Sequence, residues 1–194
     1  FAFSNKEFNE IGWFYCSGSS DDIDRYITYN YLENVWSIGE LSRTAWLDEG
    51  IFENPLATEG SANSSILYNH ETGSDADGVP MDNVFIESGD IDIDEGEQFG
   101  FVSRIIPDVK FFGSTPTSGQ INYVLKSRNY PGESLTTNST SDVTSSTTQN
   151  FVRTRARQLV FRVQSDDDAD TGVRTGFKWR LGANRFDIRT DGRR

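Results

Sequence analysis

The sequence contains one cysteine and one histidine, and both scarcities limit what the chain can do. The lone Cys16 excludes an internal disulfide framework and is typical of a reducing cytosol. Only His70 could supply the base of a Ser-His-Asp triad, and no serine lies in a G-x-S-x-G motif. A zinc site usually takes several His or Cys ligands. We therefore expect no enzyme, metal or cofactor, and we interpret His70 as a strand-end residue hydrogen-bonded to a neighbour.

Long apolar runs and helical periodicity are also missing. No stretch approaches the ~20 apolar residues of a membrane-spanning helix. The first residue is Phe1 rather than Met and no intact signal peptide follows it, so we interpret the chain as a fragment of a longer polypeptide. The phosphate-binding motifs GxxxxGK[ST] and GxGxxG do not occur. Apolar residues do not recur at i, i+3, i+4 and i+7 between helix caps, and the chain is predicted to be all-β.

Aromatic residues, by contrast, make up 13% of the chain, which predicts a folded protein. Turn-forming residues separate four segments with strand character, at 10–17, 24–31, 35–41 and 44–46. The first two form a hairpin, and Asn34 turns the chain into the third. Antiparallel strands made in sequence form a meander, which is also the structure of one propeller blade. We assign 1–48 to a propeller-like meander that belongs to a larger domain.

A stretch without periodicity separates this meander from the rest of the chain. Residues 49–64 carry Gly, Pro and Ser and are predicted to be a linker. Residues 65–194 are predicted to form a β-sandwich or barrel-like domain. Its expected strands lie at 65–71, 84–88, 90–94, 100–106, 121–130, 152–164 and 173–189. The Ser/Thr/Asn-rich residues 133–150 are expected to be a flexible loop or an arm.

The segment 152–164 changes character halfway along. Its odd positions carry arginine first and apolar residues afterwards: Arg153, Arg155, Arg157, Leu159, Phe161 and Val163. Either a β-bulge resets the register near Arg157, or the arginine half leaves the sheet and faces a partner. The three arginines are our candidate subunit-interface residues. Arginines of this kind also bind phosphate, but pairing with carboxylates, within the chain or between subunits, is the favoured interpretation.

Charge is distributed unevenly along the chain. Residues 151–194 hold 11 basic and 6 acidic residues, a net charge of +5, whereas residues 1–150 hold 7 and 24, a net charge of −17. An acidic body and a basic end can attract each other, within one chain or between copies. The basic end alone suggests nucleic-acid binding, but the acidic body would be repelled by a duplex.

Other clusters suggest alternative functions. Two groups of aspartates precede or flank glycines, namely Asp75, Asp77 and Asp82, and Asp166, Asp167, Asp168 and Asp170. Neither group has the EF-hand spacing, so solvated turns are favoured over calcium sites. A glycosidase needs two carboxylates at a suitable distance from each other. The chain has 30 Asp and Glu residues, so some pair always looks plausible, and the sequence alone does not identify a catalytic pair. Tryptophans can stack on sugars, but strand alternation favours burial for most of Trp13, Trp36, Trp46 and Trp179.

Several stretches resemble the tail-hub, or nozzle, proteins of short-tailed bacteriophages, also described as packaged-DNA stabilisation proteins. They are WFYCSGSSDDIDRYITYNYLENVWSIGELSRTAW, LYNHETGSDADGVPM, FIESGDIDIDEGE, FVSRIIPD and WRLGANRFDIRTDGRR. The family pattern often shows WFYPS and R-x-R-G-R-Q, where this chain has Cys16 and Ala156. Ala156 in place of Gly puts a close backbone approach at that point in doubt.

The resemblance implies that the chain is the C-terminal portion of a structural subunit of the virion tail, made in the cytoplasm of the bacterial host. Copies of such a subunit form a ring, commonly hexameric, between portal-proximal adaptor and distal tail proteins. The ring continues the DNA channel, retains the packaged genome and allows its ejection, without sequence-specific binding of the passing duplex. An acidic channel wall would let DNA slide without sticking. The alternative function is a glycan- or receptor-binding β-sandwich module of a virion or cell surface.

Overall fold

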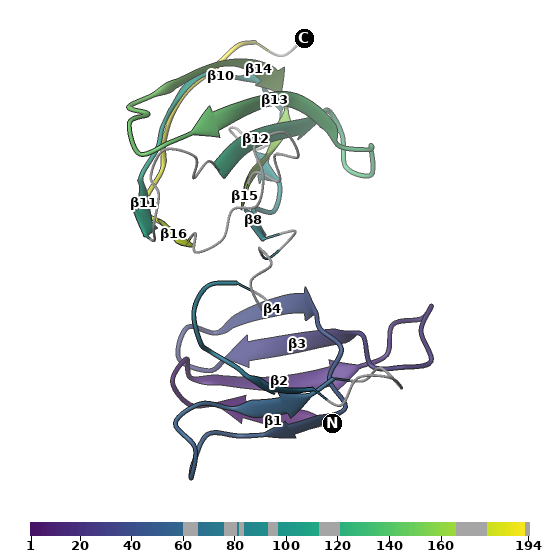
Figure 1. The fold of residues 1–194 in the computed structure, drawn as a ribbon. Helices are drawn as coiled ribbons and strands as arrows, with labels where there is room; N and C mark the ends of the chain where they lie inside the picture. The colour runs from purple at the N-terminus through teal and green to yellow at the C-terminus, as the bar shows by residue number, and fades with distance from the viewer. Residues whose placement is uncertain are drawn as a thin grey trace. The chain divides into compact units, whose positions relative to one another are not determined.

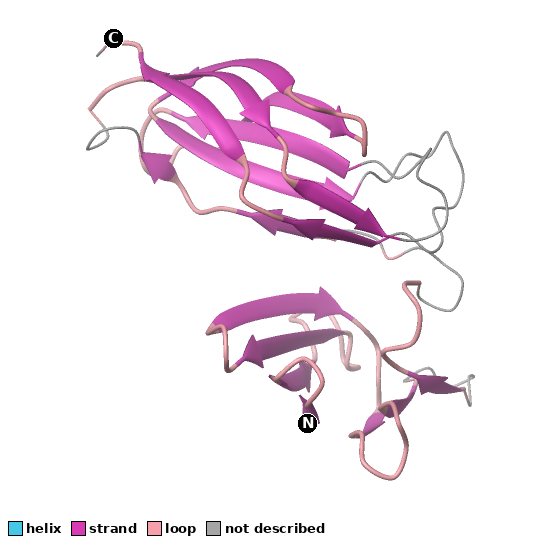
Figure 2. Cartoon of the chain, turned by 90° about the vertical axis from the view of Figure 1, so that its left-hand side faces the viewer, coloured by secondary structure: helices cyan, strands magenta, loops and turns pink. Residues whose placement is uncertain are grey.

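The chain folds into two compact units, Phe1–Gly73 and Ser74–Arg194 (Figure 1). The computed structural model describes residues 1–59, 66–75, 81, 84–92, 97–112, 121–165 and 178–192. Every regular element in these residues is a β-strand (Figure 2), and strands account for 57% of the described residues. The all-β prediction is confirmed. None of the described antiparallel sheets closes into a barrel.

Unit 1 begins with a four-stranded antiparallel meander. Its strands lie in the order β1 (Ala2–Asn5), β2 (Glu10–Tyr15), β3 (Arg25–Asn30) and β4 (Val35–Glu40). Asn9 and Asn34 take positive φ values of 59° and 57° in two of the turns, a conformation that asparagine adopts more readily than most residues. The hairpin and the Asn34 turn match the sequence prediction. The sheet order is that of a propeller blade.

A second, three-stranded sheet completes unit 1. It consists of β5 (Ala45–Leu47), β6 (Leu56–Thr58) and β7 (Leu67–Asn69). The fourth meander strand was expected at 44–46, but that strand opens this second sheet, and β1 supplies the fourth strand instead. The reason is aromatic packing, since the Trp46 ring lies 4.7 Å from Phe3 and 5.6 Å from Phe14, centroid to centroid.

This packing also moves the domain boundary. The predicted linker, 49–64, contains β6, and β7 was assigned to the second domain. In the structure both strands belong to unit 1, which extends to Gly73. Residues 60–65 lie outside the described part. Strand β6 has three residues and lies in a segment rich in glycine, proline and serine, so the sequence shows no strand periodicity there. Its pairing with β5 and β7 defines it as a strand.

The described residues of unit 2 form two larger sheets and a small one. The largest has the order β13 (Thr136–Val143), β12 (Ile121–Arg128), β15 (Gln158–Ser165) and β8 (Phe85–Glu87), with β9 (Ile91–Asp92) also paired to β15. The second has the order β14 (Asn150–Ala156), β10 (Gly100–Ile106) and β17 (Arg185–Thr190). The third pairs β11 (Val109–Phe112) with β16 (Lys178–Leu181).

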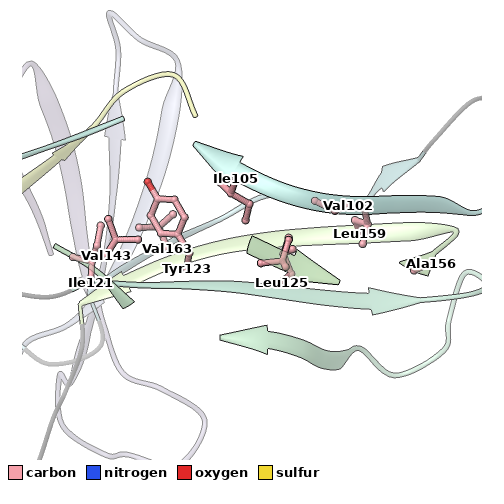
Figure 3. Packing of buried hydrophobic residues seen from close by; sticks show 10 residues of the cluster. Val102, Ile105, Ile121, Tyr123, Leu125, Val143, Ala156, Leu159 and Val163 are labelled. Atoms are coloured by element: carbon pink, nitrogen blue, oxygen red, sulfur yellow. The ribbon is translucent and has the colours of Figure 1, made fainter. Parts of the chain in front are cut away.

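The two larger sheets enclose the core of unit 2. Val102 and Ile105 of β10 point toward Leu125 of β12 and Leu159 of β15 (Figure 3). Apolar residues from both sheets are fully or almost fully buried there: Val102, Ile105, Ile121, Tyr123, Leu125, Val143, Val152, Ala156, Leu159 and Val163. Side chains of two sheets interdigitating in this way make a sandwich rather than a barrel. Ala156 is 1% exposed, so its methyl group fills space in this core.

The expected loop or arm at 133–150 contains strand β13 instead. Its Ser- and Thr-rich sequence is mostly exposed, and it pairs with β12 at the edge of the largest sheet. Polar residues are tolerated there because an edge strand is wetted by solvent, and β-branched threonine favours extended backbone. The prediction was wrong because it took polarity to indicate a loop.

Both long C-terminal strands of the prediction are interrupted in the structure. The first breaks at Arg157, where the chain leaves the sheet of β10 and enters that of β12. The phase change seen in the sequence is therefore a switch between sheets, as at the corners of sandwiches. The second breaks at 182–184, where the backbone N–H groups of Gly182 and Ala183 donate to Asp108 at 2.7 and 3.0 Å.

Candidate interaction surfaces

The outer face of the sheet β14–β10–β17 is rich in arginine. Val102, Ile105, Val152 and Thr154 point into the core, and a β-bulge between Val102 and Arg104 lets both β10 residues do so. On either side of the bulge, the residues between these buried ones point outward. We call this surface the arginine face. It consists of Phe101, Arg104, Phe151, Arg153, Arg155, Arg185, Asp187 and Arg189. Five arginines against one aspartate make it basic.

Cross-strand neighbours order the arginine face into rows. Phe101 lies between Arg155 and Arg189, and the Arg189 guanidinium lies 4.7 Å from the centre of the Phe101 ring. In the next row Arg104 pairs with Asp187 at 2.6 Å and lies opposite Phe151. The Phe151 ring is 75% exposed. Aromatic rings and guanidinium groups are therefore neighbours on the arginine face. Both kinds of side chain are enriched on binding surfaces.

The three predicted interface arginines have different positions. Arg155 bonds to Asp191 at 2.6 Å, so part of its charge is met within the unit. Arg157 lies in the bend between sheets with its guanidinium 5.1 Å from the Phe99 ring, and it is not part of the outer face. Arg153 is exposed on the outer face, and no described side chain pairs with it. Arg153 and Arg155 therefore share one surface, whereas Arg157 helps to hold the bend.

The sequence prediction missed the arginines of β17. Arg185 and Arg189 are four residues apart on one side of that strand, and Asp187 lies between them. Their alternation was visible in RFDIRT, but their placement on the same sheet face as Arg153 and Arg155 depends on β14 and β17 pairing with β10 from its two sides. That pairing joins residues more than thirty positions apart in the sequence.

Unit 1 has an exposed apolar face on the outer side of its meander. Phe3, Phe14 and Thr28 point into the unit, so the alternate residues point outward. We call this surface the tryptophan face. It consists of Ile11, Trp13, Tyr15, Arg25, Ile27, Tyr29, Trp36, Ile38 and Glu40. Trp36 is 57% and Ile38 71% exposed, and Trp36 stacks on Trp13 with ring centroids 6.1 Å apart.

The expected burial of most tryptophans is therefore only half right. Trp46 packs between the two sheets of unit 1, and Trp179 packs on the core of unit 2. Trp13 and Trp36 are exposed on the tryptophan face. Strand alternation places both on one face of the sheet, but it does not determine which face is covered by the rest of unit 1.

His70 follows β7 and packs into the interior of unit 1. Its Nε2 accepts a hydrogen bond of 3.0 Å from Nε of Arg43, and its ring lies 4.7 Å from Trp46. Burial, with the positive charge of Arg43 added, lowers the pKa of His70 from 6.5 to about 4. This geometry agrees with the interpretation of His70 as a strand-end residue bonded to a neighbour.

The lowered pKa makes a testable prediction about acid stability. Unfolded His70 takes up a proton below about pH 6.5 and folded His70 only near pH 4, so we expect unit 1 to lose stability as pH falls through this window. His70→Gln should remove that loss. The measurement is the difference in free energy of unfolding between the two proteins at pH 7 and pH 4.5. An equal difference at both pH values would contradict the prediction.

Two carboxylates in unit 1 change stability with pH in the direction opposite to His70. Partial burial, together with neighbouring negative charge, raises the pKa values of Glu10 and Glu71. Their cost to stability is greatest at neutral pH and is relieved as they take up protons in acid. Because both proteins in the His70 comparison contain these glutamates, their effect cancels in the difference.

The acidic turns singled out in the sequence are mostly outside the described residues. Asp77, Asp82, Asp166, Asp167, Asp168 and Asp170 all lie there, and only Asp75 is described. Within the described ranges, no three His, Cys, Asp or Glu side chains gather closely enough to hold a metal ion. A shallow hollow on unit 2 is lined by Ile106, Pro107, Asp108, Ala183 and Arg185, with a single carboxylate among them.

Comparisons with known proteins assign the chain to no group. No protein-family model matches the sequence, and no curated protein is significantly similar to it. In the part of the chain that the structure describes, no helix is long and apolar enough to cross a membrane. The two surfaces described above are therefore the features from which a function has to be argued.

Proposed function

We propose that the chain is a structural subunit of a phage tail, a hub or nozzle ring that continues the DNA channel, retains the packaged genome and allows its ejection. The observation that carries this proposal is the arginine face. Arg153 is exposed without a described partner, beside a Phe151 ring that is 75% exposed. Aromatic residues and arginine are the side chains most enriched at protein–protein contacts.

The charge of unit 1 supplies a complementary surface for such a ring. Unit 1 has 3 basic and 12 acidic residues, a net charge of −9. A closed ring is built from two different surfaces of the subunit, one docking on the other in the next copy. Opposite charge steers such partners together and sets their register more than it adds affinity. The resemblance to tail-hub proteins, seen in the sequence, supports the same function.

Reversing the charge of the arginine face tests the proposal. We expect Arg153→Glu combined with Arg155→Glu to weaken self-association roughly tenfold or more, because like charges opposed across an interface cost several kcal/mol. Sedimentation over a range of concentrations measures the oligomer mass, and electron microscopy shows whether rings form. Circular dichroism checks that the fold is kept, as both side chains are exposed on β14.

Lys178→Glu combined with Arg180→Glu is the matched control. Both side chains are exposed on β16, outside the arginine face, and the change in net charge is the same. The control should assemble as the unmodified chain does. A chain that stays monomeric at its highest soluble concentration, or a double variant on β14 that assembles normally, would contradict the proposal.

A glycan- or receptor-binding module is the second candidate function. The exposed Trp13–Trp36 pair favours it, because stacked indoles can bind the apolar faces of sugars. A monomer that binds glycans on an array, and loses binding when Trp36 is replaced by alanine, would support this second function over the first.

A further inference from the structure

We infer that the tryptophan face of one copy is the docking site for the arginine face of another copy. This inference deepens the proposed function, on which it rests, because it names the second surface of the ring contact. Each face belongs to a different unit of the chain, so one copy offers both, and docking between copies is head to tail.

The first argument is the exposed apolar area of the tryptophan face. Its three rows run across β2, β3 and β4: Ile11–Tyr29–Trp36, Trp13–Ile27–Ile38 and Tyr15–Arg25–Glu40. Two of the three rows are entirely apolar or aromatic. A contiguous apolar patch of this kind, rimmed by polar residues, marks an interaction site in a folded protein.

The second argument is chemical complementarity. The tryptophan face offers exposed indole and phenol rings, and Glu40 pairs with Arg25 at its end at 2.9 Å. The arginine face offers guanidinium groups and the exposed Phe151 ring. Guanidinium groups bind well over indole rings, so Arg153 has a suitable partner in Trp36 of another copy. The −9 charge of unit 1 attracts the same arginines over a longer distance.

The third argument is the shape of the two surfaces. Both are the outer faces of antiparallel sheets with side chains in cross-strand rows, which a β-bulge between Val102 and Arg104 interrupts on the arginine face. The hollow described above lies at the end of β10, and Arg185 is the one residue of the two faces among those that line it. Two faces of antiparallel sheets can pack against each other over several rows, as sheets do in sandwiches.

Two variants, each lacking one face, test the inference by mixing. Ile38→Glu places a charge in the tryptophan face at a side chain that is 71% exposed, and Arg153→Glu with Arg155→Glu disables the arginine face. Each variant alone should sediment as a monomer at a concentration where the unmodified chain is oligomeric. Mixed one to one, they should form a species of two chains and nothing larger. The intact arginine face of the Ile38→Glu variant can dock on the intact tryptophan face of the other variant, and no second pair of intact faces remains.

The mixture also proves that both variants are folded, since each contributes a working face. Ile51→Glu is the matched control, because Ile51 is 98% exposed in a loop outside the tryptophan face. It should assemble as the unmodified chain does. If Ile38→Glu assembles normally while the arginine variant does not, the inference falls and the proposed function stands.

Other outcomes overturn the inference in distinguishable ways. If Ile38→Glu alone forms dimers, the arginine face binds itself, and if the arginine variant alone forms dimers, the tryptophan face binds itself. If the mixture stays monomeric, the two faces do not dock. If the unmodified chain is itself a monomer, both the inference and the proposed function fail, and glycan binding by that monomer would assign the tryptophan face to sugars.

Discussion

Replacing Ile105 by alanine should lower the free energy of unfolding of unit 2 by about 2–5 kcal/mol. Ile105 is completely buried on β10, where it faces the residues of the opposite sheet (Figure 3). The loss combines the transfer free energy of the removed methyl and methylene groups with the cost of the cavity, which two hydrogen-bonded sheets cannot easily close. Denaturant unfolding, followed by amide exchange in β10 and β12, measures the change.

The neighbouring residue provides the control for this prediction. Ile106→Ala makes the same chemical change one position further along, where the side chain points outward and is only half-buried. We expect its cost to stay below about 1 kcal/mol, as for most substitutions outside a core. Similar losses for both variants would contradict the structure, in which Ile105 is buried in the core and Ile106 is not.

Replacing Gly12 by alanine should destabilise unit 1 by about 1–3 kcal/mol, the usual cost of overpacking. Gly12 pairs with Phe3 across β1 and β2, and the Phe3 ring lies directly over it, where an added methyl group would overlap the ring. Phe3 cannot move freely, because its ring packs 4.9 Å from Phe14 and 4.7 Å from Trp46. The measurement is the free energy of unfolding, followed by tryptophan fluorescence.

Two further variants make the Gly12 prediction specific. Gly18→Ala lies in the β2–β3 loop, where an added methyl group would meet no other atom, so its effect should be near zero or slightly stabilising. Adding Phe3→Leu to Gly12→Ala should recover part of the overlap cost, since a smaller side chain leaves room for the methyl group. If the two glycine variants were equally stable, crowding by Phe3 would not explain the glycine.

Particular residues show how far the sequence determines this protein. The hairpin from Glu10 to Asn30 was predictable because both strands alternate and the loop between them is full of turn formers. The end of β10 before Pro107 was predictable because proline cannot donate to a sheet. The phase change at Arg157 was also visible. These features depend on neighbours in the sequence, which is why the all-β class followed from composition and local pattern alone.

Long-range pairing decided the rest. Whether Arg157 marked a bulge or a departure from the sheet depended on β14 pairing with β10 and β15 pairing with β12, partners that local sequence does not specify. The pairing of β17 with the other edge of β10 brings Arg185 and Arg189 onto the same sheet face as Arg153 and so creates the arginine face. Alternation placed Trp13 and Trp36 on one side of the meander, but the covering of the opposite side by Trp46 decided which side stays exposed. The alternation of a strand divides its residues between two faces, but it does not say which face is buried. Only the packed structure decides that.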